Sequence, residues 1–173
     1  MRRRHKARRW TLQILYAWEV RGQERDLEAE AADFFARRQL ASQTRDYAER
    51  LIGALSANLS EIDATLTGAA ENWDLERMAI IDRNILRIAV AELLHVDDVP
   101  WKVAIDEAVT LASRYGGADS PRFVNGVLDA LAHKLNLQVV EMREEVRAHG
   151  VSRADTRNEE EGDAQHLRRR ETQ

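Results

Sequence analysis

The sequence contains no cysteine and only two prolines among its 173 residues. Without cysteine the chain has neither a disulfide framework nor a thiolate zinc site, so we expect a protein of a reducing compartment, the cytoplasm. No apolar run approaches the roughly 20 residues of a membrane-spanning helix, and no small-residue cleavage site follows the basic start. We therefore expect one cytoplasmic globular domain with no membrane anchor and no signal peptide.

Recognisable catalytic and metal-binding motifs are also missing. The five histidines lie far apart in the sequence and form no HExxH pair. The stretch YGGADSP does not fit the GxxxxGK[ST] pattern that wraps a phosphate. Asp106 and Glu107 are adjacent acids, but neighbouring residues of a helix point about 100° apart, so surface charge or helix pairing explains them better than acid–base catalysis. We expect no enzyme activity, no metal and no cofactor.

What the chain does have is a cluster of positive charge at its start. Residues 1–10, MRRRHKARRW, contain six arginines or lysines and no acid, which leaves 20 cations against 30 acids in the other residues. Cations gathered at one end of an acidic body create a local field that can hold a polyanion such as nucleic acid. The alternative is a solvated tail that only aids solubility.

Apolar residues recur at helical spacing along most of the chain, and no alternating strand pattern is present, so the sequence predicts an all-α fold. Of the six predicted helices, the first includes the basic start and ends near Gly22, the second covers 27–40, and the third runs from Ser42 or Thr44 to about residue 66. The fourth is capped by Asp74 and runs to His95. The fifth follows Pro100 and stops at Gly116, and the sixth is capped by Ser120 with Pro121 as its first residue. The fourth is apolar on more than one side and should lie at the centre.

A second face of the first helix carries polar residues at helical spacing, namely Lys6, Arg9, Gln13 and Tyr16. A helix would hold these cations and the ring in fixed register, which suits phosphate contacts and base stacking on single-stranded nucleic acid. On spacing alone, Tyr16 fits the core equally well. Arg83 and Arg87, one helical step apart, and Arg122 beside Phe123 could extend the positive track or could be ordinary surface charges.

The end of the chain is poor in apolar residues. Residues 150–173 offer too little burial to offset the roughly 1–2 kcal/mol per residue that ordering costs, so we predict a disordered charged tail. Residues 138–149 could extend the last helix. The tail reads as a solvated appendage; in the alternative, its acids fold back and compete with nucleic acid for the basic start.

The stretches KARRWTLQILYAWE, WDLERMAIIDRNILRIAVAELLHVDDVPWKVAIDEAVTLASRYG and DSPRFVNGVLDALA together resemble the NusB family of transcription antitermination factors. The similarity spans most of residues 4–135. It implies two small helical bundles packed into one domain, 1–137, without enzyme activity. It also implies binding to boxA RNA of nascent ribosomal transcripts together with NusE, a ribosomal protein of the small subunit. The pair would help RNA polymerase pass terminators.

The same resemblance implies which residues bind RNA. It singles out Arg4, His5, Lys6, Arg8 and Tyr16 of the first helix, Arg87 of the fourth, and Asp119, Arg122 and Phe123 before and within the last. The NusE contacts stay unassigned, and a monomer or a homodimer is expected. Two alternatives remain open. The chain could be the RNA-targeting domain of a ribosomal RNA cytosine methyltransferase, although it lacks the α/β domain and the cysteine, or a helical adaptor for protein partners.

Overall fold

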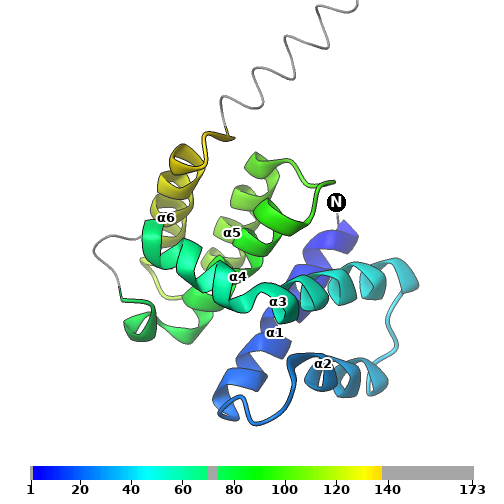
Figure 1. Cartoon of the computed structure of the whole chain (residues 1–173). Coiled ribbons are helices and arrows are strands. Elements are labelled where there is room, and N and C mark those ends of the chain that lie inside the picture. The colour runs from blue at the N-terminus through cyan, green and yellow to red at the C-terminus, as the bar shows by residue number, and fades with distance from the viewer. Residues whose placement is uncertain (1, 70–73, 138–173) are drawn as a thin grey trace, which may run out of the picture. The chain divides into compact units, whose positions relative to one another are not determined.

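A computed structural model describes residues 2–69 and 74–137 (Figure 1). Their helices are α1 (Arg2–Val20), α2 (Leu27–Ala36), α3 (Ser42–Ala69), the short 3-10 helix η1 (Leu75–Arg77), α4 (Ile80–His95), α5 (Trp101–Tyr115) and α6 (Ser120–Lys134). The all-α prediction is confirmed, and no strand occurs in these two ranges. All seven elements belong to one unit, Met1–Lys134. The predictions for 138–149 and 150–173 fall outside the described residues, and the predicted boundary at residue 137 stays a prediction.

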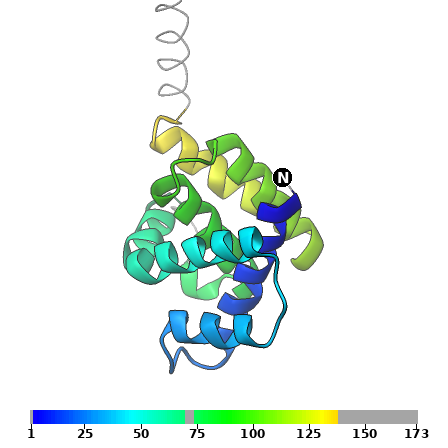
Figure 2. The same cartoon turned by 90° about the vertical axis from the view of Figure 1, so that its right-hand side faces the viewer.

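Helix α4 lies at the centre of this unit. Every residue from Asn84 to Glu92 is buried, and α4 packs against α1, α3, α5 and α6. The two views in Figures 1 and 2 show α2 at one end, beside α1 and α3, and α5 next to α6 at the other. The result is two small bundles, α1–α3 and α4–α6, joined through α3 and α4. The prediction that the fourth helix, which is apolar on more than one side, lies at the centre is confirmed.

Helix α1 begins in the basic start and ends where the sequence predicts. Gly22 has a φ of +75°, a backbone conformation that glycine adopts without steric cost. The N–H of Gln23 donates to the carbonyl of Trp18 at 3.0 Å and closes the helix end. The indole N–H of Trp18 in turn donates to the carbonyl of Arg25 at 2.7 Å, which fixes the loop toward α2. The basic start is therefore part of a packed helix.

Two predicted helices have different bounds. The helix predicted over 27–40 ends at Ala36, because the exposed residues that follow have no burial to stabilise another turn. The helix predicted from Asp74 is interrupted, since Asp74 caps only η1, accepting from the N–H of Glu76 at 3.1 Å. Met78 and Ala79 then adopt extended backbone with ψ of 147° and 135°. No glycine or proline marks this break; the burial of Met78 overrides local helix propensity.

Two further residues depart from the predicted pattern. Ser120 is the first residue of α6 and not its cap, because its hydroxyl accepts from the N–H of Gly117 at 2.8 Å and donates to Asp82 at 2.9 Å. Within α3, Asn58 leaves helical geometry with φ −127° and ψ 19°, and its side-chain amide donates to the carbonyl of Ala54 at 2.9 Å. Side-chain hydrogen bonds that compete with the helix explain both departures.

Candidate nucleic-acid interface

The polar face predicted on α1 is exposed. Tyr16 is 44% exposed, which excludes the core position that spacing alone left open. Gln13 and Lys6 are exposed, and Arg9 is half-buried. The Nζ atom of Lys6 lies 4.9 Å from the ring centroid of Trp10, so its charge is held over an aromatic ring. Cations and a phenol ring thus lie in fixed order along one side of the helix.

A small hollow opens beside this face. We call it the tyrosine hollow; its volume is about 210 Å³ and its lining residues are Arg9, Leu12, Gln13, Tyr16, Ile81 and Tyr115. Tyr16 comes from α1 and Tyr115 from the end of α5, so two flat rings border one space. The Nε atom of Arg9 is buried and has no hydrogen-bond partner within the described ranges. A flat group that accepts hydrogen bonds, such as a nucleobase, suits this hollow, because it can stack on a tyrosine ring and accept from Arg9.

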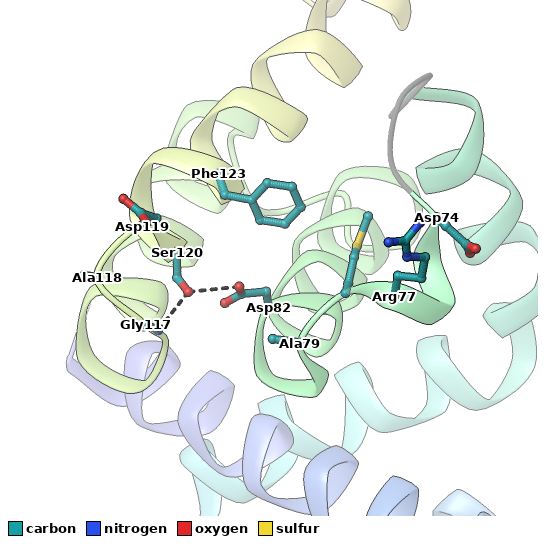
Figure 3. A pocket seen from close by; sticks show the side chains of 10 residues that line it. Asp74, Arg77, Ala79, Asp82, Gly117, Ala118, Asp119, Ser120 and Phe123 are labelled. Atoms are coloured by element: carbon teal, nitrogen blue, oxygen red, sulfur yellow. Dashed lines mark hydrogen bonds between the residues drawn. The ribbon is translucent and has the colours of Figure 1, made fainter.

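A larger hollow of about 590 Å³ lies between η1 and the turn from α5 into α6, and we call it the turn hollow. Figure 3 shows the ring of Phe123 on one side and Arg77 on the other. Asp119 lines it as well. At its base Asp82 accepts from Ser120, while the second carboxylate oxygen, Oδ1, is buried and lacks a hydrogen-bond partner among the residues that the structure describes.

Residues adjacent in the sequence line the two hollows. Ile81 lines the tyrosine hollow and its neighbour Asp82 lines the turn hollow. Likewise, Tyr115 lines the tyrosine hollow and Gly117 lines the turn hollow. Both hollows therefore lie at the beginning of α4 and the end of α5. Tyr16 lines one hollow and Phe123 lines the other, 107 positions further along the chain.

Three other residues of the basic start turn toward α4, α5 and the loop between them. Arg8 is 2% exposed; its Nε donates to Glu92 at 2.7 Å, and its Nη1 lies 3.4 Å from Glu107. The Nδ1 atom of His5 lies 2.7 Å from Glu107. Arg4 pairs with Asp98 in the loop between α4 and α5. The basic start thus has two faces, one exposed and one bound to carboxylates of the same chain.

Glu92 is the anchor of the internal face. It receives hydrogen bonds from Arg8 and from the hydroxyl of Tyr47. Burial raises the pKa of Glu92, with Arg8 opposing the shift. Burial and the adjacent Glu92 carboxylate raise the pKa of Tyr47, so the hydroxyl keeps its proton and remains a donor. This network joins α1, α3 and α4 in the core.

Arg87 lies inside the helix packing. It is 5% exposed, and its Nε and Nη2 donate to the two carboxylate oxygens of Asp63 at 2.7 and 2.8 Å. Its Nη1 donates to Glu19, which also receives Arg83 at 3.2 Å. Arg83 and Arg87 therefore link α4 to α1 and α3, and neither extends an exposed positive track.

The structure thus divides the nine predicted residues into groups. Lys6 and Tyr16 lie on the exposed face, Asp119 and Phe123 line the turn hollow, and Arg122 is exposed near them. Arg4 and His5 are partly exposed but paired, and Arg8 and Arg87 are buried and paired. Their RNA contacts stay predictions. Sequence reasoning missed Tyr115 and Glu92, although a lone acid in the apolar stretch AVAELL was a signal for a buried partner.

Among 2–69 and 74–137, no group of three or more His, Cys, Asp or Glu side chains is placed to hold a metal ion. Within the described part of the chain, no helix combines the length and apolar character that crossing a membrane requires.

Comparison with known sequences gives one family. The chain matches the NusB family over residues 5–133. The transcription antitermination protein NusB of Chloroherpeton thalassium is 42% identical over 134 residues, which cover 73% of this chain and 60% of that protein. Its counterpart in Microcystis aeruginosa is 51% identical over 100 residues, covering 57% and 46%, and that of Rubrobacter xylanophilus is 39% identical over 133 residues, covering 76% and 91%. The chain thus spans less than two thirds of the first two relatives.

Comparison of folds points the same way. NusB of T. maritima superposes with a TM-score of 0.69 at 36% identity, covering 75% of this chain and 90% of that one. A structure of the antitermination factors NusB and NusE in complex with dsRNA superposes with a TM-score of 0.68 at 28% identity, covering 78% and 98%. Because sequence and fold agree over most of the described residues, the chain belongs to the NusB family, as the sequence resemblance implied.

Proposed function

We propose that this protein is a transcription antitermination factor that binds boxA RNA of nascent ribosomal transcripts together with NusE. Its similarity to proteins named for antitermination supports this, as does its likeness to a NusB that was solved with NusE and dsRNA. The bound pair acts on the RNA polymerase elongation complex in the cytoplasm, and the protein itself catalyses no reaction.

The observation that carries the proposal is the exposed face of α1 beside the two hollows. Lys6 supplies a charge for a phosphate, and Tyr16 supplies a ring at the edge of a base-sized space. Phe123 and Asp119 continue the surface on the turn hollow, with Arg122 exposed nearby. Single-stranded RNA presents unstacked bases that such rings can receive.

The paired residues have different roles in this proposal. Arg4 and His5 are partly exposed and can exchange their carboxylate partners for RNA. Arg8 and Arg87 would have to leave buried carboxylates, and leaving a buried charge unpaired is costly. We therefore assign Arg8 and Arg87 a positioning role, in which they hold α1 against α4 and keep the exposed face in register.

The test is a titration of boxA RNA, in the presence of NusE, at several salt concentrations. Tyr16→Ala should weaken binding by about 1–3 kcal/mol, roughly five- to 150-fold, because a stacked base is lost. Lys6→Gln should flatten the slope of log Kd against log salt by about 0.7, the value for one phosphate contact on a single strand. Arg37→Gln, an equal charge change at the exposed end of α2, is the control and should leave the slope unchanged.

The adaptor hypothesis gives a different result. If the protein mainly joins protein partners, wild type and Tyr16→Ala will bind boxA RNA equally, and NusE will be captured undiminished after nuclease treatment. A role in RNA binding requires the Tyr16 variant to lose RNA while its melting temperature is unchanged, since the ring is exposed.

A further inference from the structure

Three guanidinium groups surround the ring of Tyr47. The Cζ atoms of Arg4, Arg8 and Arg50 lie 4.9, 5.6 and 5.7 Å from the ring centroid. Tyr47 is 4% exposed, and its hydroxyl donates to Glu92, so the ring is fixed. Arg8 is buried and committed to Glu92. Arg4, from α1, and Arg50, from α3, remain at the surface as a pair.

One aspartate bridges Arg4 and Arg50. The carboxylate of Asp98 accepts from Arg4 and from Nη2 of Arg50 at 3.0 Å, and its backbone carbonyl accepts from Nη1 of Arg4 at 3.0 Å. The side chains of Arg4, Asp98 and Arg50 are 40%, 47% and 51% exposed. Figure 1 shows the start of α1 close to the loop that enters α5, where Asp98 lies.

The arrangement has the geometry of a phosphate site. A carboxylate and a phosphodiester each carry one negative charge and two terminal oxygens that accept from the planar guanidinium fork. The face of Tyr47 keeps both arginines in place by cation–π contact. We propose that Arg4 and Arg50 form a binding site for an RNA phosphate, and that Asp98 occupies this site as an intramolecular competitor until RNA displaces it.

Asp98 is suited to be displaced. It lies in a loop, and exposed ion pairs of this kind contribute little to stability. Its pKa lies below the ordinary value, above all because Arg50 donates a hydrogen bond to it, so it is an anion at neutral pH. The negative charge of Asp97 also raises the pKa of Arg50, so the cluster holds two acids and two arginines. Because the cluster has no net charge, it binds small anions weakly. It binds the phosphate of an RNA already held by the face of α1 more strongly, since that second contact is intramolecular.

This inference rests on the proposed function and adds a residue to it. Arg50 is not among the residues that the sequence resemblance implies, and its carboxylate partner follows α4, 48 positions further along the chain. Because contacts to phosphate do not depend on base identity, the site should act equally on boxA RNA and on an RNA of scrambled sequence. That property separates it from the stacking of bases on Tyr16.

The experiment measures binding of boxA RNA and of a scrambled RNA of equal length to the full chain with NusE, at several salt concentrations. Asp98→Asn should tighten the binding of both RNAs about two- to five-fold and steepen the salt slope by up to about 0.7. Arg50→Gln should weaken both, and the double variant should show no gain from Asp98→Asn. The matched control is Asp33→Asn, which makes the same charge change on α2 and releases Arg25, in the loop between α1 and α2, from an exposed pair of 2.7 Å.

The outcomes are separable. If Asp98→Asn leaves affinity unchanged or lowers it, or if the gain persists in the Arg50→Gln background, the competitor role is wrong. An equal gain from Asp33→Asn also overturns it, because net charge would then be the cause. If wild type does not prefer boxA to scrambled RNA, while Asp98→Asn still tightens both, the proposed function fails and the phosphate site stands.

Discussion

The guanidinium of Arg8 and the carboxylate of Glu92 form a buried ion pair between the first and fourth helices. Their side chains are 3% and 1% exposed, and Arg8 Nε lies 2.7 Å from Glu92 Oε1. The hydroxyl of Tyr47 donates to the same carboxylate. The basic start is therefore anchored to the core by Arg8, while Lys6 and Arg9 lie on the other face of the helix, Lys6 exposed and Arg9 half-buried.

Breaking this pair should remove a large part of the protein's free energy of unfolding. Arg8→Ala leaves the buried carboxyl group of Glu92 without its cation, and we expect a loss of about 3–5 kcal/mol in the free energy of unfolding, measured by urea titration. The double variant Arg8→Met/Glu92→Gln should recover part of this loss, because no buried charge remains and Tyr47 can donate to the amide carbonyl. A single variant as stable as wild type would contradict the structural role.

The exposed pair at Asp98 predicts a small acid sensitivity. Hydrogen bonds from Arg50 and Arg4 lower the pKa of Asp98 in the folded protein, while the pKa of an aspartate in the unfolded chain is about 3.9. The stabilisation is therefore complete above that value and is lost as pH falls through the lower folded-state pKa. The free energy of unfolding of wild type minus that of Asp98→Asn should be constant near neutral pH and shrink below about pH 4. A difference that grows on acidification would contradict this.

Two glycines should respond oppositely to alanine. A Cβ on Gly116 would lie 2.4 Å from Cβ of Ser120 and 2.8 Å from the carbonyl oxygen of Ala112, so Gly116→Ala should cost about 1–3 kcal/mol. Gly126 lies within α6, where a Cβ meets nothing within 4 Å. Gly126→Ala should raise the free energy of unfolding by about 0.4–1 kcal/mol, because alanine restricts the unfolded chain and favours helix. Thermal melts of both variants would check the signs.

The hydroxyl of Ser120 ties the turn before α6 to α4. Ser120→Ala removes the donor to Asp82 and the acceptor of the Gly117 N–H, so we expect a loss of about 1–3 kcal/mol in unfolding free energy. Ser113→Ala, on the exposed side of α5, should change it by less than about 0.5 kcal/mol. Equal effects of the two substitutions would show that the Ser120 hydroxyl bonds do not stabilise the turn.

Much of the fold could be predicted because helical periodicity reports burial directly. The stop near Gly22, a helix start at or near Ser42 or Thr44 and the central place of α4 all follow from local pattern and composition. The interruption after η1 could not be predicted in this way. Met78 leaves helical geometry to bury its side chain, and that depends on packing partners distant in the sequence.

The candidate site could be predicted less completely. Its exposed face, with Lys6 and Tyr16, follows from spacing on α1. The burial of Arg8 could also be predicted from spacing, because Arg8 precedes the buried Thr11 and Leu15 by three and seven positions. The pairing of Arg8 with Glu92 could not be predicted, since 84 positions separate the two residues and no local pattern joins them.

The most direct test of the central claim is crosslinking of boxA RNA to the full chain in the presence of NusE, with the crosslinked residues mapped individually. We predict crosslinks at Lys6 and Tyr16 on the exposed face of α1 and at Phe123 on α6; Tyr16 lines the tyrosine hollow and Phe123 lines the turn hollow. Crosslinks confined to α2, with none on the exposed face of α1, would contradict the account.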